Sequence, residues 1–109
     1  MTVEINLIDY QELWIPRGSV LRVRSIIDKD PNWYVEKQVD LMVFDATNLK
    51  GIYGLIAVSG TKAGLINIVF PQESSDDESV GLRTKWLVDN WEKWVHPAGD
   101  VDSVILILL

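Results

Sequence analysis

Two apolar runs that flank a short glycine-containing loop constrain the fold of this chain most strongly. Residues 52–59 and 65–70 are almost entirely apolar, and the loop of residues 60–64 carries a glycine at each end. Two such runs around a short loop predict a β-hairpin. Apolar side chains occupy both parities of each run, so we expect both faces of the hairpin to be covered and the hairpin to lie centrally in a sheet.

Further strands are predicted before this hairpin. Residues 2–7 alternate between polar and apolar side chains with the period of two that a half-buried strand requires, so we expect the first ten residues to form a strand. Pro16-Arg17-Gly18 is a typical turn, and the strand after it has a basic outer face, because apolar residues there alternate with Arg22 and Arg24. One long strand is then expected over residues 33–45.

One amphipathic helix is predicted over residues 82–95, where apolar side chains recur with a period of 3.6 residues. Pro97 and Gly99 end it. The last segment, residues 104–109, has no polar face and would promote aggregation at an open sheet edge. We therefore expect this segment to be an inner strand, or a strand that a second subunit covers.

Chain length and the order of the predicted elements define the expected architecture. The chain has 109 residues, 48% of them hydrophobic, which suits a single domain over residues 1–109 with one core. The pattern predicts a mainly β (α+β) fold: an antiparallel, sandwich-like sheet of five or six strands, with one helix of the C-terminal half packed on it.

Charge and composition exclude several classes of function. Sixteen acidic residues against ten basic ones give a net charge of −6, which repels nucleic acid and attracts basic partners. The absence of cysteine excludes disulfides and cysteine-ligated metals, and fits a reducing compartment. The chain shows no secretory signal and no apolar run long enough for a bilayer, so we expect a cytoplasmic protein that does not bind membranes.

Few residues of the chain support catalysis or metal binding. The one histidine, His96, follows the predicted helix, where its charge suits the negative end of the helix dipole. The nearby Asp100 and Asp102 are too scattered to form a metal site with it. We expect no metal, no cofactor and no enzymatic activity; general acid/base chemistry by Asp76 and Asp77 is the enzyme alternative.

Acidic residues crowd residues 72–79, between the hairpin and the predicted helix. They are Glu73, Asp76, Asp77 and Glu78. No basic residue lies between Lys62 and Arg83. The segment is either a solvated acidic loop, with part of its charge facing the positive end of the helix dipole, or a binding surface for a basic partner.

Trp86 is the second candidate for partner binding. On the predicted helix it projects about 140° away from Trp91, near Asp89, at 100° per residue. An exposed tryptophan beside acidic residues suits an interface anchor. Alternatively, Trp86 covers a neighbouring loop or lies at a dimer interface, and this alternative explains its position equally well. The candidate partner-binding residues are therefore Glu73, Asp76, Asp77, Glu78, Trp86 and Asp89.

The hairpin and the helix together resemble a known class of protein. Residues 51–73 and 86–94, in a small acidic domain without cysteine, are similar to the immunity proteins of contact-dependent growth inhibition and related polymorphic toxin systems. The resemblance implies that the chain binds the C-terminal toxin domain of a cognate exported effector and occludes it. Such toxins are often nucleases, for example tRNases, whose basic surfaces an acidic inhibitor would approach quickly.

Two alternatives stand beside this interpretation. A small module that binds single-stranded nucleic acid would use Arg22 and Arg24 with the aromatic rings of Trp14, Trp33 and Tyr34 on a sheet face. The acidic balance of the chain counts against it. Independently, the apolar strands suggest a homodimer.

Overall fold

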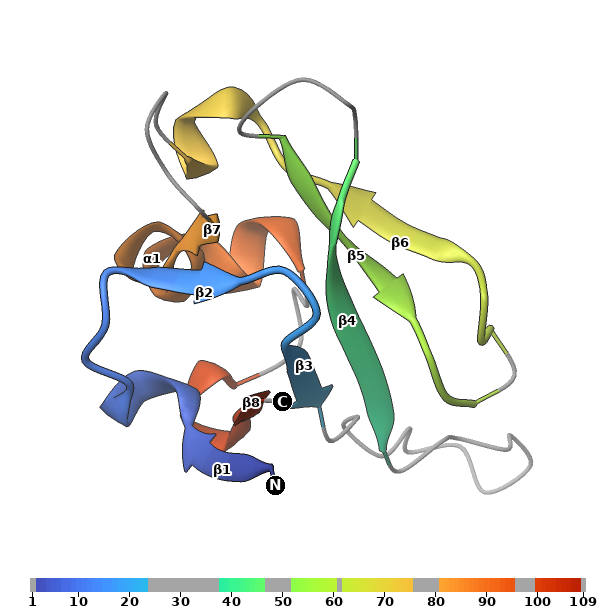
Figure 1. Cartoon of the computed structure of the whole chain (residues 1–109), viewed down its shortest axis with the longest axis horizontal. Helices are drawn as coiled ribbons and strands as arrows, with labels where there is room; N and C mark the ends of the chain where they lie inside the picture. Colours follow the sequence, from blue (N-terminus) through green and yellow to red (C-terminus); the bar gives the residue numbers. More distant parts are fainter. Residues whose placement is uncertain are drawn as a thin grey trace.

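Six antiparallel strands form the main sheet of the protein (Figure 1). The computed structural model describes residues 2–23, 38–46, 52–60, 62–75, 81–95 and 100–108. The strands of the main sheet are β1 (Val3–Asn6), β3 (Val20–Val23), β4 (Val39–Asp45), β5 (Tyr53–Ala57), β6 (Ile66–Val69) and β8 (Ile105–Leu108). Their order across the sheet is β1-β8-β3-β4-β5-β6.

A second, smaller layer contains the helix. Strands β2 (Trp14–Pro16) and β7 (Gly81–Arg83) pair antiparallel, and α1 (Thr84–Trp94) follows β7 without a loop. Figure 1 shows β2, β7 and α1 together beside the main sheet. The short 3-10 helices are η1 (Leu7–Asp9), η2 (Gln72–Ser74) and η3 (Val101–Ser103).

The core joins the main sheet to this second layer. Alternate residues of the sheet strands face it, and the fully buried ones are Leu21, Val43, Leu55 and Leu106. The second layer and η1 contribute the fully buried side chains of Leu7, Ile15, Leu82, Leu87 and Trp91 to the same cluster. Each fully buried leucine of this kind contributes roughly 1.5 to 3 kcal/mol to folding.

The predicted mainly β fold with one helix is confirmed, and the main sheet is an open antiparallel sheet rather than a closed barrel. The smaller β2–β7 sheet was not predicted. Its strands have three residues each, too few for a periodic pattern to show. An added side chain at Gly81 would collide with the backbone of Ile15, so glycine permits this close strand pairing.

Several predicted boundaries were wrong. The first strand ends at Asn6, because Leu7 starts η1 and donates its N–H to Val104 O at 2.9 Å. The helix begins at Thr84 rather than residue 82, since the preceding residues pair with β2. Of the strand expected over residues 33–45, β4 confirms the part from Val39; residues 33–37 lie outside the described ranges.

The hairpin of β5 and β6 is confirmed, but its predicted central position is only half right. Strand β5 lies between β4 and β6, whereas β6 forms an edge of the sheet. Leu65 and Ile66 are 62% and 60% exposed, so the expectation that both faces are covered was wrong for this strand. Apolar content alone does not reveal whether a strand has a second neighbour.

The prediction for the last segment is confirmed. Strand β8 lies between β1 and β3, where both of its edges are hydrogen-bonded. Its side chains Leu106 and Ile107 are buried although they point to opposite faces. An inner position thus removes the aggregation hazard that a fully apolar strand presents at an edge.

We expect Leu55→Ala to lower the free energy of unfolding by about 2 to 5 kcal/mol, because it leaves a cavity beneath the sheet. Leu65→Ala deletes the same atoms from a side chain that is 62% exposed, and should change stability by no more than about 0.5 kcal/mol. Urea unfolding of both variants measures this difference. Equal losses in the two variants would contradict the assignment of Leu55 to the core.

Candidate partner-binding surfaces

The acidic segment begins on a well-anchored turn. Glu73 is exposed on η2, while Ser74 and Ser75 beside it are buried. The Ser74 hydroxyl donates a hydrogen bond to Pro71 O at 2.7 Å, and the Ser74 N–H donates to the same carbonyl at 3.0 Å. The side chain of Glu73 is therefore presented to solvent from an ordered turn. The other predicted residues of the segment, Asp76, Asp77 and Glu78, lie outside the described ranges.

The described residues test the expected interaction between the acidic segment and the helix dipole only in part. Strand β7 separates the acidic segment from α1 in the sequence, and the first turn of α1 contains no acidic residue. Arg83, at the N-cap position, makes no side-chain capping hydrogen bond. The dipole interaction falls off beyond the first turn, and Asp76, Asp77 and Glu78, which are expected to take part in it, lie outside the described residues. His96, the predicted cap at the other end of the helix, lies outside the described residues.

Trp86 is half-buried, which favours the alternative that its ring covers a neighbouring segment over that of a fully exposed anchor. Its ring packs edge-on against Phe70, with ring centroids 5.5 Å apart, and lies 6.0 Å from the ring of Trp94. The helical angle correctly placed Trp86 away from the face of Trp91. However, the end of the β6 segment covers this second face as well, and no periodicity within the helix reveals that. Trp86 thus connects α1 to the residues that lead into the acidic segment.

Asp89 is exposed on α1, three residues after Trp86. Its carboxylate accepts a hydrogen bond from Lys85 Nζ at 2.8 Å, one helical turn earlier. An exposed pair of this kind contributes about 0.3 to 0.5 kcal/mol. Asp89 and Lys85 both line a hollow at the start of the helix. Asp89 thus lies beside Trp86 on the helix surface, while its carboxylate is paired with Lys85 at the hollow.

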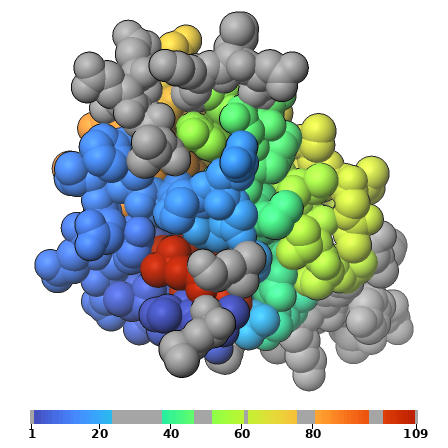
Figure 2. All heavy atoms as spheres, viewed as in Figure 1, coloured from blue at the N-terminus to red at the C-terminus, as the bar shows by residue number. Residues whose placement is uncertain are grey.

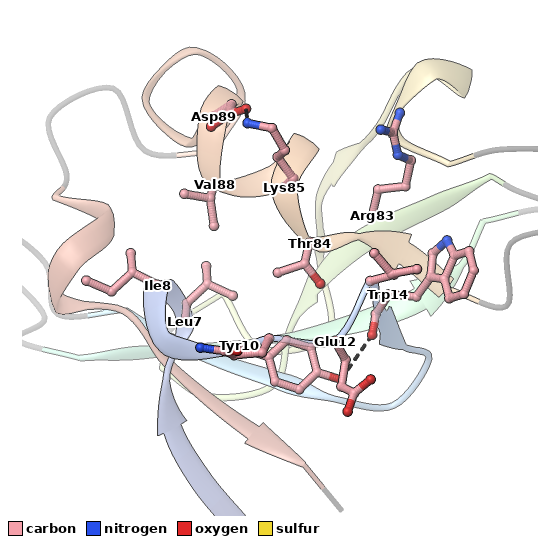
Figure 3. Close-up of a pocket in the computed structure, with 12 residues that line it drawn as sticks. Leu7, Ile8, Tyr10, Glu12, Trp14, Arg83, Thr84, Lys85, Val88 and Asp89 are labelled. Carbon is pink, nitrogen blue, oxygen red and sulfur yellow. Dashed lines mark hydrogen bonds and ion pairs between the residues drawn. The ribbon is translucent and has the colours of Figure 1, made fainter.

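This hollow was not predicted from the sequence. It has a volume of about 610 Å³ and lies between the segment from Leu7 to Trp14 and the first turns of α1 (Figure 3). Tyr10 donates a hydrogen bond to Trp14 O at 3.0 Å there, and burial together with the charge of Glu12 raises the pKa of its hydroxyl. The buried Thr84 hydroxyl has no hydrogen-bond partner among the described residues.

The lining of the hollow carries both negative and positive side chains. Glu12 and Asp89 supply carboxylates, while Arg83 and Lys85 supply cations. Of these, Asp89 and Lys85 already neutralise each other. Among the described residues, the lining contains neither histidine nor cysteine. Within the described parts of the chain, no group of three or more potential ligands from His, Cys, Asp and Glu is placed to hold a metal ion.

A third surface is the exposed apolar side of the hairpin. We call it the hairpin patch; it consists of Val58, Leu65, Ile66 and Val69. Their side chains are 45% to 62% exposed. Sequence reasoning marked these residues as apolar but assigned them to a covered strand, so the patch was missed.

The basic face expected for a nucleic-acid module is largely neutralised. Arg22 makes a bidentate contact with Asp40, with Nε–Oδ1 and Nη2–Oδ2 distances of 3.0 and 3.2 Å. Glu4 lies 3.7 Å from the same guanidinium, and the hydrogen bond from Arg22 to Asp40 raises the pKa of Arg22. Arg24 lies outside the described residues. Arg22 is therefore already occupied by carboxylates and is a poor ligand for phosphate.

Comparison with protein families identifies the class. The sequence model of the family named Immunity protein 45 matches residues 7–106, which is nearly the whole chain. The chain belongs to the Immunity protein 45 family. The predicted membership among the immunity proteins of toxin systems is thereby confirmed. No match was found among curated proteins or among solved structures.

Membership in this family indicates what kind of partner the three surfaces would contact. An immunity protein has a cognate toxin as its partner and serves to neutralise it, and such families are generally non-catalytic. The hollow, the acidic segment and the hairpin patch are thus candidates for contacting a protein. No helix of the described residues is long and apolar enough to cross a membrane.

We expect Trp86→Ala to lower the free energy of unfolding by about 1 to 3 kcal/mol, because it removes the contacts with Phe70 and Trp94. Lys85→Ala, at the neighbouring position, loses only an exposed ion pair and should cost about 0.5 kcal/mol or less. Thermal or urea unfolding compares the two. Unchanged stability of Trp86→Ala would show that its ring is free for a partner.

Proposed function

We propose that this protein binds one cognate toxin domain in the cytoplasm and neutralises it by occluding its surface, without catalysis of its own. The observation that carries the proposal is the match of the Immunity protein 45 model over residues 7–106. An inhibitor that acts by occlusion needs a stable surface of complementary shape and charge, not a catalytic set. The confirmed sheet and its packed helix supply a rigid frame for such a surface.

The partner we propose is a basic nuclease, such as a tRNase. A net charge of −6 on 109 residues favours encounter with a basic surface, and the nucleic-acid-binding face of a nuclease is of this kind. Charge complementarity of this sort raises the association rate more than it slows dissociation. The proposal therefore assigns the acidic residues chiefly to the speed and selectivity of encounter.

We place the first contact at the acidic segment. Glu73 is exposed on its anchored turn, and Asp76, Asp77 and Glu78 follow it in the sequence. In this proposal Trp86 acts as a positioning residue, since its contact with Phe70 holds the chain that leads into η2 against α1. Asp89, exposed on α1 three residues after Trp86, contributes further charge.

Co-expression tests the function itself. Cells that produce the toxin domain encoded beside this gene should survive when they also produce this protein, and the two proteins should purify together. A toxin from an unrelated system is the matched control and should not be neutralised. Failure of both protection and complex formation with the neighbouring toxin would end the proposal.

We expect a variant with Glu73→Gln, Asp76→Asn, Asp77→Asn and Glu78→Gln to associate with the toxin about tenfold more slowly at low salt, with a flatter salt dependence. The reason is the loss of the local negative potential that steers a basic partner. Surface plasmon resonance at several salt concentrations measures both quantities.

The control variant removes four exposed acidic side chains elsewhere, so that the change in net charge is equal. These are Asp9, Asp45, Glu92 and Asp102, none of which lines the hollow. If both variants slow association equally, total charge rather than the acidic segment steers the encounter.

A further inference from the structure

The two edges of the main sheet differ in how they resist pairing with another strand. At one edge, β1 carries Glu4, whose charge interacts with Arg22. At the other edge, β6 reads Ile66-Asn67-Ile68-Val69, with neither a charged residue nor a proline. Charged side chains and prolines are the usual means by which proteins block edge-to-edge pairing. Strand β6 lacks both.

The backbone of β6 also has hydrogen-bonding groups turned outward. Phe70 N–H donates to Tyr53 O at 2.9 Å, so the backbone of Phe70 faces β5. In an antiparallel pair, successive residues turn their backbone groups alternately toward and away from the neighbouring strand. Val69 therefore directs its N–H and C=O away from β5. No strand of the described chain lies on that side.

Apolar side chains surround this edge. Ile66 pairs with Ile56, and Val69 pairs with Gly54 across an irregularity in the register, so both lie on the sheet face opposite the core. A side chain at Gly54 would collide with the Phe44 ring and with Ile68 O, so that ring covers the glycine. The edge thus combines unpaired backbone groups with an apolar face. Figure 2 shows the hairpin strands, light green to yellow, along one side of the molecule.

We propose that the toxin adds an extended strand to β6, continuing the main sheet and covering Ile66 and Val69. In strand addition, main-chain hydrogen bonds give affinity and alternate side chains give specificity. Strand β6 leads within a few residues to the exposed Glu73. A toxin strand with apolar side chains and basic flanking residues would therefore match both the apolar edge of β6 and the negative charge beside it. This inference rests on the proposed function and specifies the surface that performs it.

The net charge of the chain favours a toxin over a second copy as the occupant. Pairing two β6 edges would bring together two chains of charge −6, whereas a basic toxin is attracted. We therefore expect the free protein to be a monomer, with a mass near 12.4 kDa by light scattering at micromolar concentration.

The sharpest variant is Val69→Pro, which removes the outward N–H while leaving the hydrogen bond between Phe70 and Tyr53 in place. Proline is tolerated at such edge positions. We expect it to weaken binding of the purified toxin domain at least about tenfold, because it blocks strand addition. Val69→Thr keeps the backbone donor and a β-branched side chain, and should bind within about threefold of the parent.

A second pair of variants does not depend on proline. Val69→Lys places a charge on the β6 edge and should also weaken binding about tenfold or more. Val3→Lys places the same charge on the β1 edge, where the parent side chain is 53% exposed against 46% for Val69, and should bind as the parent does. Circular dichroism of each variant checks that the fold is retained.

Binding and protection by the parent protein test the proposed function, whereas binding by the Val69 variants tests strand addition at β6. If the parent protein neither binds nor protects, the proposed function fails and the β6 inference with it. If the parent protects and the Val69 variants bind equally well, the toxin uses another surface and only the β6 inference is overturned. If the free parent is a dimer and Val69→Lys is a monomer, a second copy occupies the edge, which also overturns it.

Discussion

The burial of one face of the main sheet beneath a small second layer is the interaction on which the rest of the structure depends. Trp91 and Leu87 of the helix reach the same buried cluster as Leu21 and Leu106 of the sheet. The β2–β7 pair makes this possible, because it fixes the chain immediately before α1 and adds Ile15 and Leu82 to the core. Without that pair, only the connecting segments would orient the helix.

This arrangement leaves the opposite face and the rim of the sheet for interaction. Part of the opposite face is closed by charge pairing, since Arg22 bridges β3 and β4 through Asp40 and reaches Glu4 of β1. The β5–β6 side has no such bridge among the described residues and presents apolar side chains instead. We therefore propose that a partner protein binds at the end of the sheet farthest from β1, beside the start of the acidic segment.

The elements that sequence reasoning predicted well are those with long or unbroken patterns. The hairpin of β5 and β6, the inner position of β8 and the helix around Trp91 all follow from hydrophobic periodicity and turn residues. The β2–β7 pair was missed because three-residue strands carry no period. The edge position of β6 was missed because pairing partners are decided by the whole topology, not by the strand's own residues.

The candidate site was less predictable than the fold for the same reason. Glu73 is exposed as expected, but the environment of Trp86 depends on Phe70, which comes from a segment distant in the sequence. A helical projection gives the direction of a side chain and not what meets it. The hollow likewise forms between Tyr10 and Thr84, which lie far apart in the sequence, so no local pattern indicates it.

We propose that this protein neutralises its toxin by stoichiometric binding. The decisive measurement is a titration of the activity of the purified cognate toxin with the purified protein. Toxin activity should fall linearly to zero at an equimolar ratio, and toxin separated under denaturing conditions and refolded should regain full activity. Inactivation by much less than an equimolar amount, or toxin that stays inactive after separation, would contradict occlusion and indicate catalysis.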